Sequence, residues 1–137
     1  MLSDIEREFL THRRIGHLAT AGHSGNPHLV PVCFVVHEQA LYTAIDEKPK
    51  SGQLLRRLRN ILENPNVTFL ADHYEEDWSR LGWIRIDGTA ELLSDGPQRT
   101  EAIRLLRSRY KQYAAMHLSA VIVIRIRHIR SWGNLDS

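Results

Sequence analysis

Two lysines that flank a proline stand between an apolar segment and an amphipathic segment near the middle of the sequence. Residues 41–45 are apolar enough for a short strand, Lys48 and Lys50 follow, and Ser51 opens a helix-like stretch. A helix start carries unpaired N–H groups and the positive end of the helix dipole. With two ammonium groups added, this pattern indicates a site for an anion, above all a phosphate, although solvated loop lysines would look the same. It is not a Walker loop, because no GxxxxGK[ST] motif occurs.

Arginine and tryptophan side chains supply the next candidates. Arg56, Arg57 and Arg59 occupy most of the polar face of the segment that Ser51 opens. Such arginines are often solvated, but Arg56 is close enough to Ser51 to reach a phosphate tail. Trp132 follows the last predicted strand, where an indole can either cover a planar ring or pack in the core.

Other catalytic patterns are missing from the sequence. There is no HExxH, CxxC or GxSxG motif, so no metal site and no nucleophile is expected. His73, next to Asp72, is either a proton donor or a histidine at the end of a barrel. Cys33 has the character of a small buried apolar residue. We therefore assign no catalytic residue from the sequence.

Length and composition indicate a single domain that spans residues 1–137. A hydrophobic content of 42% and a charged content of 25% are those of a soluble globular protein. One cysteine excludes an intramolecular disulfide and fits a reducing cytoplasm. We expect no signal peptide and no membrane span, because the first residues are polar and no apolar run approaches about 20 residues. The net charge of +2 does not by itself argue for nucleic acid.

Periodicity predicts six strands and three helices. Ser3 and Glu6 have the spacing of a capping box, and strict alternation across 81–93 separates Ile84 and Ile86 from Arg85 and Asp87. In the second helix, Leu58, Ile61 and Leu62 belong to the apolar stripe. The predicted helices cover 4–13, 51–63 and 95–113, and the predicted strands cover 15–21, 28–36, 41–45, 67–72, 81–93 and 120–129. Hairpin connections favour a mainly β, antiparallel fold that closes into a small barrel with flanking helices.

The order of these segments resembles a known family. IGHLATA, a Gly/Pro turn, HLVPVCF, LYTAIDEKPK, ENPNVTFL and WIRIDGTAEL follow one another as in the pyridoxamine 5'-phosphate oxidase-like, FMN-binding split barrels. DEKPK, DHYEEDWSRLGW and the C-terminal SW look most like the PPOX-class subgroup of F420-dependent oxidoreductases. The resemblance covers nearly the whole chain and implies a six-stranded antiparallel split β-barrel.

The resemblance also implies a homodimer with two cofactor sites at the subunit interface. The cofactor would be the deazaflavin coenzyme F420 or, alternatively, FMN. In such a site the phosphate would be held by Lys48, Lys50 and Ser51, and the ring would be lined by Pro31, Val32 and Cys33. The remaining implied contacts are Thr43, Ala44 and Ile45 along the cofactor and Trp83, Arg85 and Trp132 near the site.

One departure narrows the expected reaction. Pyridoxamine phosphate oxidases end with an Arg-x-His-x-Arg-type substrate motif, whereas this chain ends SWGNLDS. Because this motif is missing, we do not expect oxidation of pyridoxamine phosphate. We expect hydride transfer between F420 and a small organic substrate, a reaction for which the cofactor itself supplies the reactive chemistry. Two alternatives are an FMN-dependent oxidase or reductase and a non-catalytic flavin- or haem-binding protein. Nucleic-acid binding is not expected, because the arginines of RIRHIR alternate with isoleucines.

Overall fold

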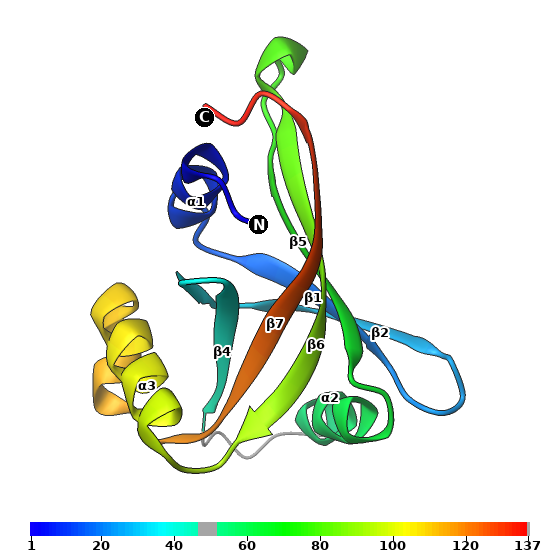
Figure 1. Cartoon of the computed structure of the whole chain (residues 1–137), viewed down its shortest axis with the longest axis vertical. Helices are drawn as coiled ribbons and strands as arrows, with labels where there is room; N and C mark the ends of the chain where they lie inside the picture. The colour runs from blue at the N-terminus through cyan, green and yellow to red at the C-terminus, as the bar shows by residue number, and fades with distance from the viewer. Residues whose placement is uncertain (47–51, 137) are drawn as a thin grey trace.

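The computed structural model contains one antiparallel β-sheet with helices around it (Figure 1). It describes residues 1–46 and 52–136, and for Asp46 and residues 52–55 it describes the backbone alone. Within these ranges the strands are β1 (Gly16–Ala21), β2 (Pro27–Val32), β3 (Val35–His37), β4 (Ala40–Asp46), β5 (Asn66–His73), β6 (Gly82–Leu93) and β7 (Leu118–Gly133). The helices are α1 (Asp4–Thr11), α2 (Gly52–Glu63) and α3 (Pro97–Arg109), with short 3₁₀ turns η1 (Trp78–Arg80) and η2 (Lys111–Ala115).

The strand order confirms the predicted split-barrel class and corrects two details. The order is β2-β1-β5-β6-β7-β4-β3, with antiparallel pairing throughout. The described residues therefore form seven strands and not six. The prediction of a closed barrel is also wrong, because β2 and β3 are the two ends of this order and do not pair with each other.

A break at Cys33 and Phe34 accounts for the additional strand. The sequence 28–36 reads as one apolar strand, but β2 ends at Val32 and β3 begins at Val35. At the break, the hydroxyl of Tyr110 lies 3.0 Å from the backbone N of Phe34 and 2.9 Å from its backbone O. A side chain thus satisfies the backbone groups that a neighbouring strand would otherwise have paired.

The three helices agree with the sequence prediction at some positions and differ from it at others. Ser3 and Glu6 make both hydrogen bonds of the predicted capping box at the start of α1. In α2, Ile61 is buried as predicted, but Leu62 is 73% exposed, so its place in the apolar stripe was wrong. α3 ends at Arg109 and not near residue 113, because Tyr110 adopts an extended conformation between α3 and η2.

The last strand is longer at both ends than predicted. β7 runs from Leu118 to Gly133, and the whole of β6 pairs with it, from Leu93–Val121 to Gly82–Gly133. Trp132 therefore lies within this strand and not beyond it. Gly82 and Gly133 permit the close approach at the far end, since a Cβ on Gly82 would lie 2.2 Å from the backbone O of Asn134.

The core fills the inner face of the sheet, and α3 covers part of the outer face. Leu18, Phe69, Ile84, Ile86 and Ile124 are among the buried residues of the inner cluster. On the other side of β4 and β7, two smaller clusters pack under α3: Ala40, Tyr42, Ala102, Val121 and Val123, and Ala44, Leu106, Tyr110 and Leu118. None of the helices in the described ranges is long and apolar enough to cross a membrane.

Candidate functional site

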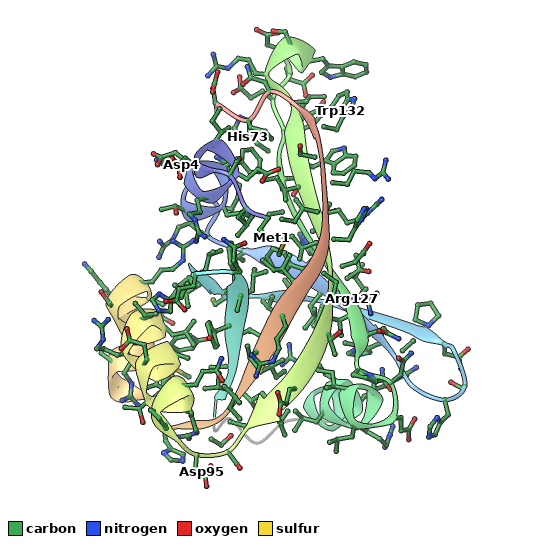
Figure 2. All side chains as sticks on the ribbon, in the orientation of Figure 1. Met1, Asp4, His73, Asp95, Arg127 and Trp132 are labelled. Atoms are coloured by element: carbon green, nitrogen blue, oxygen red, sulfur yellow. The ribbon has the colours of Figure 1, made fainter. Side chains whose placement is uncertain are left out.

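Trp83 and Trp132 lie directly opposite each other on β6 and β7. Side chains of opposed residues in an antiparallel pair share one face of the sheet. Trp132 is 53% exposed and Trp83 is half-buried. Figure 2 shows Trp132 on the upper part of β7, beside the β5–β6 hairpin that projects from the body. The two tryptophans predicted to lie near the site are thus neighbours on one open face.

Arg85 belongs to the same face, one row below this tryptophan pair. Its guanidinium carbon lies 5.7 Å from the centre of the Trp83 ring, within cation–π range. Across the strands, Arg85 is opposite Leu70 on one side and Arg130 on the other. Like charges directly opposite each other on two strands are unfavourable. An anion or a carboxylate placed over Arg85 and Arg130 would therefore stabilise this pair.

The same row continues to Pro31 at the edge strand. Leu70 is opposite His17, and His17 is opposite Pro31. Pro31 is exposed, whereas Val32 is buried in the core and Cys33 is half-buried against the cluster under α3. Of the three residues predicted to line a ring, Pro31 is the one that is exposed.

The three predicted β4 residues lie elsewhere in the fold. Thr43, Ala44 and Ile45 are all buried, with Ile45 in the inner core and Ala44 against α3. The pairing of β4 with β3 stops at Tyr42, so the described strands leave the β3-side edge of β4 without a partner from Thr43 onward. These residues can therefore meet a ligand through backbone groups at this edge, while their side chains serve the core.

The structure describes only one of the residues predicted to bind the phosphate. Lys48, Lys50 and Ser51 lie outside the described residues, so their role stays a prediction. Arg56 is described on α2 and is half-buried. The pKa of His28 is lowered first by burial and then by the charges of Arg56 and Arg57. No motif in the sequence marks His28 as a site residue, but Pro27, Leu29 and Pro31 are exposed on alternate positions of β2, which places His28 on the inner face.

The tip of the β5–β6 hairpin carries a charged cluster. Glu75 Oε2 accepts a hydrogen bond from Arg80 Nε at 2.9 Å and lies 2.7 Å from His73 Nε2. The hydrogen bonds from His73 and then Arg80 hold the pKa of Glu75 below its usual value. His73 is thus at the end of β5 with a carboxylate partner. Tyr74 and Trp78 are exposed at the same tip.

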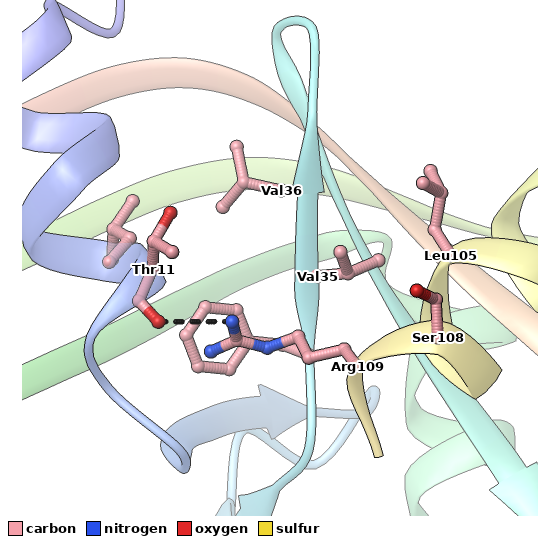
Figure 3. Close-up of a pocket in the computed structure, with 8 residues that line it drawn as sticks. Thr11, Val35, Val36, Leu105, Ser108 and Arg109 are labelled. Carbon is pink, nitrogen blue, oxygen red and sulfur yellow. Dashed lines mark hydrogen bonds between the residues drawn. The ribbon is translucent and has the colours of Figure 1, made fainter. Parts of the chain in front are cut away.

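A pocket of about 240 Å³ lies apart from these residues, between α1, β3 and α3 (Figure 3). Arg109 points into it but already serves the fold: its guanidinium donates to the backbone O of Thr11 at 3.0 Å and lies 5.1 Å from the centre of the Phe34 ring. The pocket contains none of the residues predicted for a cofactor. Among the described residues, no group of three His, Cys, Asp or Glu side chains is placed to hold a metal ion.

Comparison with known proteins identifies the family. The family model for pyridoxamine 5'-phosphate oxidase matches residues 2–133, and the chain therefore belongs to this family. A 5a,11a-dehydrotetracycline/5a,11a-dehydrooxytetracycline reductase of Streptomyces rimosus is 33% identical over 92 residues, which are 66% of this chain. The match spans 63% of the length of that curated relative.

Solved structures show the same fold. A conserved hypothetical protein of Mycobacterium tuberculosis has a TM-score of 0.77 at 22% identity, with 97% of this chain and 86% of that chain covered. An FAD-binding protein of Mesorhizobium loti has a TM-score of 0.67 at 26% identity, with 95% and 94% covered. These similarities confirm the split-barrel fold that the sequence predicted.

Proposed function

We propose that this protein is an oxidoreductase that transfers a hydride between the deazaflavin coenzyme F420 and a small organic substrate. The observation that carries the proposal is the open sheet face on which Trp83 and Trp132 are opposed, with Arg85 next to them. The family and the reductase among the relatives support an oxidoreductase. The subgroup motifs DEKPK and DHYEEDW favour F420 over FMN, which remains the alternative cofactor.

The residues present fit a planar cofactor that carries a phosphate. Indole rings offer apolar surface to a tricyclic ring, and a guanidinium beside them complements negative charge. When bound, F420 or FMN supplies hydride chemistry of its own. Trp83, Trp132 and Arg85 would contact the ring of the cofactor. The β4 edge from Thr43 onward would run along the cofactor. Its phosphate would be held by Arg56 together with Lys48, Lys50 and Ser51.

We also propose that the protein is a homodimer that pairs through this open face. Leu29, on the same face as Arg85 and two residues from Pro31, is 64% exposed, and Trp132 is 53% exposed. Large exposed apolar side chains on one sheet face are typical of an interaction surface. A second copy would cover them and could complete each cofactor site. The single cysteine fits a reducing cytoplasm, where we expect the protein to act.

The test is a binding titration with four candidate cofactors. Purified protein is mixed with F420, FMN, FAD or haem, and tryptophan fluorescence is recorded. We expect F420 to quench the fluorescence with saturation at one cofactor per chain. The Trp83→Phe and Trp132→Phe variants should lose part of this quenching. Trp78→Phe, at the exposed hairpin tip, is the matched control and should keep the binding constant of the unaltered protein.

Binding must then be followed by turnover. Reduced F420 should be oxidised in the presence of an enone of the size of a tetracycline ring system, followed by the change in deazaflavin absorbance. Stoichiometric FMN with no response to F420 would replace the proposed cofactor by the alternative one. Binding of haem alone would contradict the oxidoreductase proposal.

A further inference from the structure

The outer edge of β3 is left open between two helices. β3 is the last strand in the sheet order, and among the described strands it pairs with β4 alone. Figure 3 shows this strand with α1 on one side and the end of α3 on the other. The cavity of about 240 Å³ lies here, with Thr11 of α1 and Ser108 of α3 in its wall. The two helices therefore flank the edge of β3 without filling the space between them.

Most of the cavity wall is apolar. The apolar residues come from α1, the break after β2, β3 itself and α3: Leu10, Phe34, Val35, Val36 and Leu105. Leu10 and Phe34 are buried, and the other three are half-buried. Pockets that bind drug-sized ligands have volumes of about 300–1,000 Å³ and mostly apolar walls. This somewhat smaller cavity therefore suits a small molecule with an apolar body.

One guanidinium group is held in a fixed position at the wall of this cavity. Arg109 Nε donates to the hydroxyl of Tyr110 at 3.1 Å, and Nη1 donates to the backbone O of Thr11 at 3.0 Å. Nη2 donates to the backbone O of Arg13. Because a guanidinium carries five N–H donors, two of them remain for a ligand. The neighbouring Ser108 is exposed, and its hydroxyl makes no hydrogen bond within the described part of the chain.

Positive charge is in excess around this guanidinium. The guanidinium carbons of Arg14 and Arg109 lie 4.7 Å and 5.3 Å from the centre of the Tyr110 ring. No carboxylate of the described residues is within ion-pair distance of either arginine, and Glu101 on α3 is paired with Arg104. The C-terminal ends of α1 and α3 each offer roughly half a negative charge, which leaves about one positive charge for an anion to balance.

We propose that this cavity binds a small molecule with an apolar body and a carboxylate group. The body packs against Phe34, Val36 and Leu105, and the carboxylate accepts hydrogen bonds from Arg109 and Ser108. β3 has only three residues, so its edge is too short for the main-chain pairing by which extended peptides bind to sheets. The cavity contains none of the residues predicted for the cofactor, and this site does not depend on the proposed function.

The first experiment uses hexanoate as the probe and hexanol as its matched neutral control. Amide NMR spectra of the whole chain are recorded during a titration with each compound. We expect saturable shifts at Val35, Val36 and Leu105, and hexanoate should bind at least about tenfold more tightly than hexanol, the value of one charge-assisted hydrogen bond. Equal affinities for the two compounds, or shifts confined to other parts of the chain, would overturn the proposal.

Ser108→Asp tests the polar end of the cavity without removing a hydrogen bond of the fold, because this serine is exposed. The added carboxylate lies beside Arg109 and repels the probe, so hexanoate should bind at least about tenfold more weakly while the affinity for hexanol stays the same. Ser24→Asp makes the same change in the exposed β1–β2 turn and should keep both affinities. An unchanged affinity for hexanoate in Ser108→Asp would refute a carboxylate site.

Leu105→Trp tests the apolar part of the cavity. The indole would occupy the space between α3 and β3, so both hexanoate and hexanol should bind more weakly. Leu62→Trp places the same side chain at an exposed position of α2 and should keep both affinities. Unaltered binding of both compounds to Leu105→Trp would contradict the proposed location.

A competition experiment separates this site from the cofactor site. FMN and F420 should leave the affinity for hexanoate unchanged, because none of the residues predicted to hold them lines the cavity. Displacement of hexanoate by either cofactor would place the probe in the cofactor site and overturn the proposal. Hexanoate binding without any flavin or deazaflavin binding would refute the proposed function and leave this site intact.

Discussion

The hydroxyl of Tyr110 contacts both backbone groups of Phe34, a residue 76 positions away in sequence. The same oxygen lies 3.0 Å from the backbone O of Arg14 and accepts a hydrogen bond from Arg109 Nε at 3.1 Å. One phenol therefore joins the end of α3, the segment after α1 and the break between β2 and β3. The break adjoins Cys33 and the open edge of β4, so Tyr110 helps to shape the region where a cofactor is proposed.

Replacing Tyr110 by Phe should destabilise the protein by about 1–3 kcal/mol, because the buried N–H of Phe34 loses its partner. Chemical denaturation followed by circular dichroism measures the loss. Tyr74→Phe is the control, since this tyrosine is exposed at the hairpin tip and should change the free energy of unfolding by less than about 0.5 kcal/mol. Equal losses in the two variants would show that the Tyr110 hydroxyl has no special role.

Gly16→Ala should also be destabilising, because a Cβ there would lie 2.1 Å from Cζ of the fully buried Phe69. Overpacking of a core costs about 1–3 kcal/mol, which thermal denaturation can detect. The double variant with Phe69→Leu should lose less than the sum of the two single variants, since the smaller side chain makes room. Strict additivity would contradict a direct clash.

Leu29→Lys should convert the proposed dimer to a monomer without unfolding it. Interfaces of obligate homodimers often bury more than about 2,000 Å², and a charge at an exposed apolar position of this face would be desolvated on pairing. Sedimentation velocity measures the change in mass. Leu62→Lys, an exposed leucine on α2, should leave the oligomeric state unaltered. A monomeric unaltered protein at micromolar concentration would rule out the dimer.

The hairpin tip should loosen in acid. The pKa of Glu75 is lowered in the folded protein, first by the hydrogen bond from His73 and then by that from Arg80. Its stabilising effect is therefore complete above the ordinary carboxyl pKa and is lost as the pH falls through the lowered value. Fluorescence of the nearby Trp78 should report a transition below about pH 4.5. Glu75→Gln should reduce this transition to the part that comes from Asp77, whose pKa is also lowered, first by the hydrogen bond from the Ser79 side chain. Glu8→Gln on α1 should retain the whole transition.

Alanine at both Lys48 and Lys50 should weaken the binding of a phosphate-bearing cofactor by at least about tenfold, since hydrogen bonds to charged groups contribute about 1.5–3 kcal/mol each. Riboflavin, which has no phosphate, should bind both proteins equally and serves as the control. Tryptophan fluorescence titration gives the two dissociation constants. An unchanged affinity for FMN and F420 in the double variant would exclude these lysines from the site.

Local patterns in the sequence were sufficient for features that depend on nearest neighbours. The alternation of residues 82–93 places Ile84 and Ile86 in the core and Arg85 on the opposite face, because successive side chains of a strand point to opposite sides. The capping box at Ser3 and Glu6 is likewise complete within four residues. The family resemblance supplied the split-barrel class, which no single periodic segment specifies.

Long-range contacts decided the remaining features. The strand predicted for 28–36 is broken because Tyr110, far along the chain, satisfies the backbone of Phe34. Trp132 is opposite Trp83 because β6 and β7 pair as far as Gly82 and Gly133. These two glycines allow the backbones to approach closely at that end. The charges of Arg56 and Arg57 act on His28 because α2 is bonded to the β1–β2 hairpin through Asn60 and Thr20. Residue types and periods determine which face a side chain occupies, but only the folded sheet determines which distant side chains share that face.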